Sequence, residues 1–182
     1  SDVIISGNTI ENNKAGHYET HPPWGFRLEG EGGGIRGGGK TDIVNNIIKG
    51  NQASRGGGID AHESKTITGN TIIGNTRGGF YGEGIREGVF SDNYVLDNIG
   101  SGSFGVGISR SRVTVSGNII AGNQGSLGYS LENYSDSHTS SISNNLIFNN
   151  SGSGYINGSD AGVLEVKNNT IVGNGGGFAL KY

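Results

Sequence analysis

The sequence predicts an all-β fold, a parallel β-solenoid in which every coil contributes three short strands. Three observations support this prediction. Two asparagines five residues apart recur in seven copies, at intervals of 23 to 27 residues after one longer interval of 38. Apolar, mostly β-branched residues keep a constant distance from these asparagines. Glycine is abundant, 37 of 182 residues, without the period of three that collagen requires. Short apolar strands repeating about every 24 residues are typical of stacked solenoid coils.

The two asparagine columns mark corners between strands. We expect each side-chain amide to bond to the equivalent amide one coil away, and the asparagines themselves to adopt the left-handed conformation that corners need. The structural role is favoured over ligand binding. The first column comprises Asn8, Asn46, Asn70, Asn93, Asn118, Asn145 and Asn169, and the second comprises Asn13, Asn51, Asn75, Asn98, Asn123, Asn150 and Asn174.

Three apolar columns are expected to point into the solenoid, since alternate residues of a strand face the same side. The first strand of each coil supplies Ile5, Ile43, Ile67, Phe90, Val115, Ile142 and Val166. The second supplies Ile10, Ile48, Ile72, Val95, Ile120, Ile147 and Ile171. The third strand, often preceded by Gly-Gly, supplies Ile35, Ile59, Ile85, Ile108, Leu131, Ile156 and Phe178.

The chain is expected to form one domain, residues 1–182, with an inserted loop at about residues 14–31 that accounts for the long interval. This loop carries Tyr18, Trp24 and Arg27, a combination of aromatic and charged groups suited to stacking on and bonding to a sugar. We therefore count these residues as candidate substrate-binding residues. The alternative is a lid that packs over one flank of the solenoid.

These repeats resemble the right-handed parallel β-helix proteins of the pectin-lyase-like class, and the resemblance covers essentially the whole chain. It implies the fold, a right-handed β-helix of about seven coils with asparagine ladders at its corners. That class includes polysaccharide lyases, hydrolases, epimerases, adhesins and phage tailspikes, so the resemblance implies no single function.

A charged column is predicted on the outer face of the third strand, formed by Arg36, Asp60 and Arg86. The segment Ile59-Asp60-Ala61-His62-Glu63 resembles the Asp-Pro-His-Glu motif of mannuronan C-5 epimerases. The resemblance implies that His62 is the acid or base at C5 of a uronic acid, with Asp60 beside it. Abstraction of a proton next to a carboxylate requires a neutralising cation, for which Arg36 or Arg86 are candidates. Ala61 stands where the family has Pro, and Gly57 where it has Tyr.

Two further residues are candidates for substrate contact beside this motif, Glu63 and Tyr81. Charges that alternate along a column can equally satisfy one another, as on any strand surface.

Composition narrows the functional classes. With no cysteine, the chain has neither a disulfide framework nor a thiolate metal site. A net charge of −3 without basic runs argues against a nucleic-acid partner, and no apolar run approaches the length of a membrane span. We expect no metal and no cofactor. The repeats fit a protein that is secreted or displayed on the cell surface.

The leading interpretation is a structural or adhesive solenoid with a carbohydrate-facing flank. Its first and last strands share one phase of the repeat, which predicts head-to-tail association into a filament; the alternative is a piece of a longer chain. The second interpretation is a polyuronate lyase or C-5 epimerase.

Overall fold

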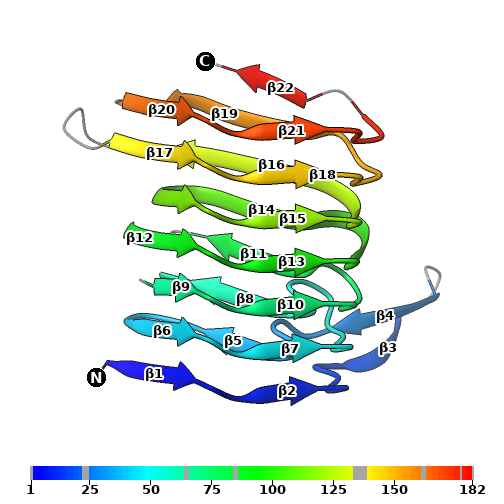
Figure 1. Ribbon diagram of the computed structural model, residues 1–182. Helices are drawn as coiled ribbons and strands as arrows, with labels where there is room; N and C mark the ends of the chain where they lie inside the picture. The colour runs from blue at the N-terminus through cyan, green and yellow to red at the C-terminus, as the bar shows by residue number, and fades with distance from the viewer. Residues whose placement is uncertain are drawn as a thin grey trace.

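The computed structural model describes residues 2–21, 25–63, 66–83, 86–132, 139–160, 163–176 and 178–181. They form a solenoid of stacked coils that advances from one end of the molecule to the other (Figure 1). All regular elements in these ranges are β-strands, and none of the described residues lies in a helix that could cross a membrane. The predicted fold class is confirmed.

Each coil passes through three walls of parallel strands. The first wall stacks β1 (Val3–Ser6), β6 (Thr41–Val44), β9 (Thr66–Thr68), β12 (Arg86–Ser91), β14 (Ile99–Ser116), β17 (Thr139–Ser143) and β20 (Val163–Lys167). The second wall has seven strands, β2 (Thr9–Glu11), β7 (Ile47–Lys49), β10 (Thr71–Ile73), β13 (Tyr94–Leu96), β15 (Ile119–Ala121), β18 (Leu146–Phe148) and β21 (Thr170–Val172).

The third wall stacks β5 (Ile35–Gly37), β8 (Ile59–His62), β11 (Phe80–Glu83), β14, β16 (Gln124–Glu132), β19 (Gly154–Asp160) and β22 (Phe178–Lys181). The long strand β14 pairs in both the third and the first wall and joins them into one sheet.

The core consists of apolar columns that run along the solenoid axis. Strand register aligns the predicted columns of the first and second walls residue by residue, from Ile5 and Ile10 to Val166 and Ile171. In the middle coils these side chains are fully buried. Phe90 also packs against Phe80 of the third wall, with ring centroids 4.5 Å apart. Both predicted columns are confirmed.

The third-wall column differs from the prediction. Register aligns Ile35 with Ile59, Phe80, Val106, Leu127, Gly154 and Phe178. Phe80 thus holds the column position that was predicted for Ile85, which lies outside the described residues. Ile108 and Ile156 belong to a second inward column, which starts at Gly37 and Ala61. Leu131 pairs with Ser111. The prediction was wrong here because the corner before this wall varies in length, and apolar residues at even separations fit more than one register.

The asparagine ladders occupy both corners that flank the second wall. Asn98 shows the pattern: its backbone N–H and its Nδ2 both donate to Asn123 Oδ1, at 3.0 and 2.9 Å, and Nδ2 also donates to the Ile72 carbonyl at 3.0 Å. Its own Oδ1 accepts from the backbone N–H and Nδ2 of Asn75. The ladder asparagines of the middle coils are buried, so these bonds replace the water that the amides lose.

The left-handed conformation falls on the residue before each ladder asparagine, not on the asparagine itself as predicted. These fourteen residues have positive φ and are Gly, Asn or Asp: Gly7, Asn45, Gly69, Asp92, Gly117, Asn144 and Asn168 at one corner, and Asn12, Gly50, Gly74, Asp97, Gly122, Asn149 and Gly173 at the other. They turn the chain, and the ladder residue that follows is free to point its amide inward.

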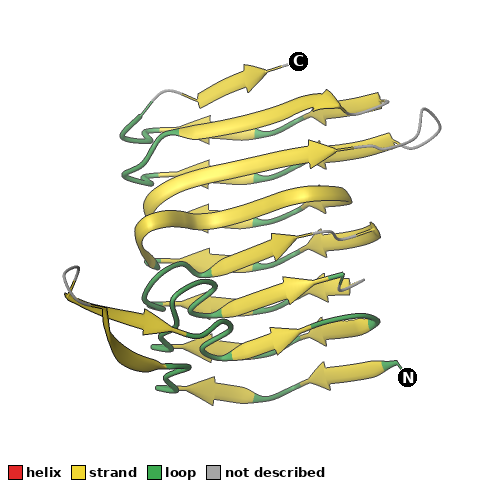
Figure 2. Cartoon of the chain, turned by 180° about the vertical axis from the view of Figure 1, so that it is seen from behind, coloured by secondary structure: helices red, strands yellow, loops and turns green. Residues whose placement is uncertain are grey.

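The inserted segment forms an antiparallel hairpin of β3 (His17–His21) and β4 (Gly25–Glu29), with His17 opposite Glu29. Seen from the front and from behind, it projects from the side of the solenoid near the N-terminal coils (Figures 1 and 2). Trp24 lies outside the described residues.

We predict that Asn98→Asp destabilises the protein by about 3 kcal/mol or more. A carboxylate donates no hydrogen bond, so it leaves Asn123 Oδ1 and the Ile72 carbonyl opposite a buried negative charge. Urea unfolding at neutral pH measures the change. Asn45→Asp is the matched control, because Asn45 is exposed and Asp occurs at the equivalent corner positions 92 and 97. Equal losses in the two variants would contradict the ladder's role.

Candidate functional site

The candidate site lies on the outer face of the third wall, at β5, β8 and β11. Ile59 and Ala61 are fully buried in the core, so alternation turns the Asp60 side chain between them away from the core. Register places Arg36 of β5 on one side of Asp60 and Tyr81 of β11 on the other. Tyr81 therefore occupies the column position that was predicted for Arg86.

A second pair of charges lies beside this column. Glu31 and Arg55 face each other across a parallel bridge, one coil apart, and each precedes a charged residue of the column, Arg36 or Asp60, by five positions. Acidic and basic residues consequently alternate both along each coil and between coils. We call Glu31, Arg36, Arg55, Asp60 and His62 the charged cluster.

Ion pairs connect the charged cluster. Glu31 Oε2 lies 2.8 Å from Arg36 Nη2, and Glu31 Oε1 lies 2.6 Å from Arg55 Nη2. Arg55 Nε lies 3.7 Å from Asp60 Oδ1. The Arg55 guanidinium also lies over the Tyr81 ring, with its central carbon 4.6 Å from the ring centroid. The Glu31 carboxylate is thus held between two guanidinium groups, with one oxygen on each.

Asp60 is the buried member of the cluster. Its side chain is 0% exposed, although it points away from the core, and neither carboxylate oxygen has a hydrogen-bond partner in the described part of the chain. Burial raises the pKa of Asp60, and the Glu31 charge adds to the rise, while His62 and the arginines oppose it. A carboxyl group in this position holds its proton more tightly than an exposed one, as groups that transfer protons often do.

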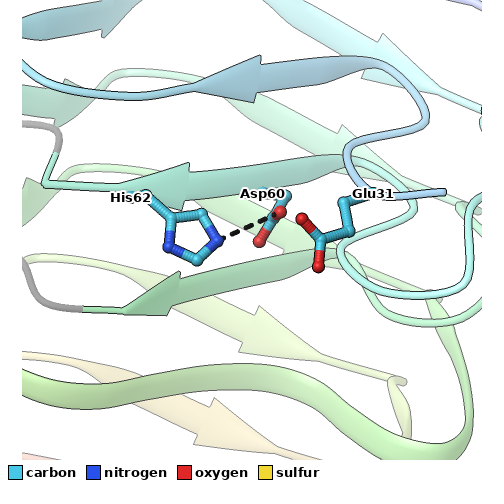
Figure 3. A group of neighbouring side chains, drawn as sticks. All are labelled: Glu31, Asp60 and His62. Atoms are coloured by element: carbon cyan, nitrogen blue, oxygen red, sulfur yellow. Dashed lines mark ion pairs between the residues drawn. The ribbon is translucent and has the colours of Figure 1, made fainter.

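His62 lies at the edge of the cluster with 31% of its side chain exposed. Its Nε2 faces Asp60 Oδ2 at 3.3 Å (Figure 3) and lies 3.2 Å from Arg55 Nη2. These neighbours favour different tautomers, because the Asp60 carboxylate accepts a hydrogen bond from a protonated Nε2, whereas the Arg55 guanidinium donates one to the lone pair of an unprotonated Nε2. With the proton on Nε2, the other ring nitrogen, Nδ1, is available as a base.

The side chains of Glu31, Asp60 and His62 offer ligand atoms within 4.8 Å of one another, a spacing that a divalent cation could bridge (Figure 3). However, Arg55 contacts all three side chains through its guanidinium group. The position of a cation is therefore already taken by a charged side chain. The donor set does not fit a metal while Arg55 stays in place.

The structure brings some of the predicted site residues together and separates others. Arg36, Asp60, His62 and Tyr81 lie together on the third wall. Glu63 follows His62 in a left-handed conformation, with φ 58°, and its side chain is exposed. Arg86 begins β12 in the first wall, opposite Arg112, so the prediction that it continues the Arg36–Asp60 column was wrong.

The structure describes the hairpin candidates Tyr18 and Arg27 only through the pairing of their strands. Tyr18 pairs with Leu28 and Arg27 pairs with Glu19, while Trp24 lies outside the described residues. Their contact with a substrate stays a prediction.

Sequence reasoning missed Glu31 and Arg55, although the repeat could have identified them. Residues 24 apart in these coils become neighbours, and subtracting 24 from Arg55 and Asp60 gives Glu31 and Arg36. The coil period places charged residues next to one another in the same way as it stacks the apolar columns.

Comparison with known families agrees with this architecture. The family described as right handed beta helix region matches residues 31–182, more than half of the chain. The chain belongs to the right-handed β-helix family. A search of curated proteins gave no match, and a search of solved structures gave none. The family establishes the fold of this β-helix, and the charged cluster has to be interpreted from its own chemistry.

We predict that Asp60→Asn makes the protein more stable at neutral pH. Because burial raises the pKa of Asp60 above its ordinary value of 3.8, the folded protein binds a proton more tightly than the unfolded chain does. Wild-type stability should therefore fall as the pH rises from about 4 through the raised pKa, a loss that the uncharged amide avoids.

Urea unfolding of both proteins between pH 3.5 and pH 8 tests this expectation, with Asp92→Asn at an exposed corner as the control. Stability curves of wild type and Asp60→Asn that stay parallel over the whole range would show that the Asp60 charge carries no net penalty.

Proposed function

We propose that this β-helix acts on an acidic polysaccharide, abstracting the proton at C5 of a uronic acid as a lyase or C-5 epimerase does. The observation that carries the proposal is the fully buried Asp60 carboxyl group against a half-buried histidine, with two arginines beside it. Proton abstraction next to a carboxylate requires these parts: a base, a group that orients it, and cations that accept the developing charge.

The chemistry assigns one role to each group. His62 Nδ1 accepts the C5 proton, and Asp60 stabilises the resulting imidazolium through Nε2. The electrons of the broken C–H bond move onto the sugar carboxylate, whose negative charge faces Arg55 and Arg36. Delivery of a proton from water to the opposite face of C5 gives the epimer. In the lyase reaction the C4–O4 bond breaks, the C4–C5 double bond forms, and the departing O4 takes its proton from the His62 imidazolium. We propose accordingly that the protein acts outside the cell or at its surface.

We predict that His62→Gln lowers turnover by a factor of about 10²–10⁴, since the amide keeps polar contacts but cannot serve as the base. Two readouts cover both outcomes on alginate and pectin: ultraviolet absorbance of an unsaturated product, and deuterium uptake at C5 from D₂O. Glu165→Gln, a change in an exposed pair with Lys167 on β20, is the control. If the wild-type protein forms no unsaturated product and incorporates no deuterium with any of these polymers, the proposal is wrong.

A second candidate function is structural, the self-association expected from the sequence. It is supported by the direction of the ladders, because the amide-to-amide bonds between described residues run from each coil to the next one toward the C-terminus. Each coil consequently presents amide acceptors toward one side and amide donors toward the other.

For this role we predict end-to-end particles of the purified chain under the electron microscope, with a mass by light scattering that rises with concentration. Monomers at all concentrations would exclude the structural candidate.

A further inference from the structure

We propose that Arg36 and Arg55 form a clamp for a carboxylate of the ligand, and that Glu31 fills this clamp as an internal, exchangeable ligand. This inference rests on the proposed function and adds a recognition step to it. The ligand class is an acidic sugar, whose carboxylate displaces the side chain of Glu31.

The geometry of Glu31 is that of a bound ligand. Its two carboxylate oxygens engage different arginines, Arg36 at 2.8 Å and Arg55 at 2.6 Å. Arg36 lies on β5, and Arg55 lies in the adjacent coil, where it forms a β-bridge with Glu31. The stacked backbone therefore fixes the distance between the two arginines. A clamp with one guanidinium for each oxygen is shaped for a planar carboxylate.

Exchange needs only a side-chain rotation. The Glu31 backbone is held by its bridge to Arg55, while its side chain is 30% exposed and that of Arg36 is 64% exposed. Ion pairs with this much contact with water contribute little to stability, so another carboxylate can compete for the same donors. The buried Asp60 next to the clamp disfavours ligands of higher negative charge, such as phosphate.

The Arg55 guanidinium belongs to the clamp and also contacts the proposed base, His62. Arg55 Nη2 contacts both Glu31 Oε1 and His62 Nε2. A sugar carboxylate in the position of Glu31 therefore shares the Arg55 guanidinium with His62. Glu31 acts in this arrangement as a positioning and specificity residue, since it does not take part in the proton transfer.

The test is binding of trigalacturonate to Glu31→Gln and Glu31→Ala, measured by calorimetry on the full chain. If Glu31 occupies the clamp nine-tenths of the time, its removal should tighten binding about tenfold. The methyl ester of the trisaccharide should show no gain, and Glu165→Gln, which removes a charge from β20, should bind like wild type. Adding Arg36→Ala to either Glu31 variant should abolish the gain.

Unchanged or weaker binding in both Glu31 variants, with circular dichroism of a folded β-protein, would overturn the clamp. So would equal gains for the acid and its methyl ester. The turnover assays are separate: a tenfold gain in binding without any turnover by the wild type supports the clamp and rejects the enzymatic function. His62-dependent turnover with unaltered binding rejects the clamp alone.

Discussion

The hydrogen bond from one asparagine amide to the amide oxygen of the next coil is the interaction on which this structure depends. At each corner the chain must turn and also bury polar groups, and an unpaired buried amide would cost about as much as several apolar contacts provide. The ladder satisfies those groups while it holds consecutive coils in the same register. Because Asn75, Asn98 and Asn123 stack directly, the isoleucines and valines beside them stack as well.

The same register creates the charged cluster. Glu31 and Arg55 are far apart in the chain and meet only because one coil separates them, and the same holds for Arg36 and Asp60. No loop has to fold over to assemble these groups. The asparagine ladders fix the register between coils, and this register sets the distances between the charged side chains. Fixed distances are what the proposed site requires of a base and its partners.

Sequence periodicity was sufficient to predict the fold, both ladders and two of the three apolar columns, because each follows from a constant spacing. It failed where spacing varies. Phe80 replaces Ile85 in the third wall, and Arg86 belongs to the first wall, because the corner before the third wall differs in length between coils. The pairing of Asp60 with His62 was visible as a short motif, whereas the ion pair of Arg55 with Glu31 beside it depends on the register between coils.

Deviations from local rules concentrate around the candidate site. In the described part of the chain, positive φ is confined to Gly, Asn and Asp except at Glu63 and Arg77. Glu63 follows the last residue of β8, and Arg77 precedes β11, so these two residues flank the strands that carry Asp60, His62 and Tyr81. A left-handed conformation costs such residues about 1 kcal/mol or more, and the buried Asp60 carboxyl group adds a further penalty. A scaffold held by ladders at two corners can tolerate these costs. Their location beside one charged cluster, rather than along all the described coils, is the physical reason for our proposal that this face of the third wall is functional.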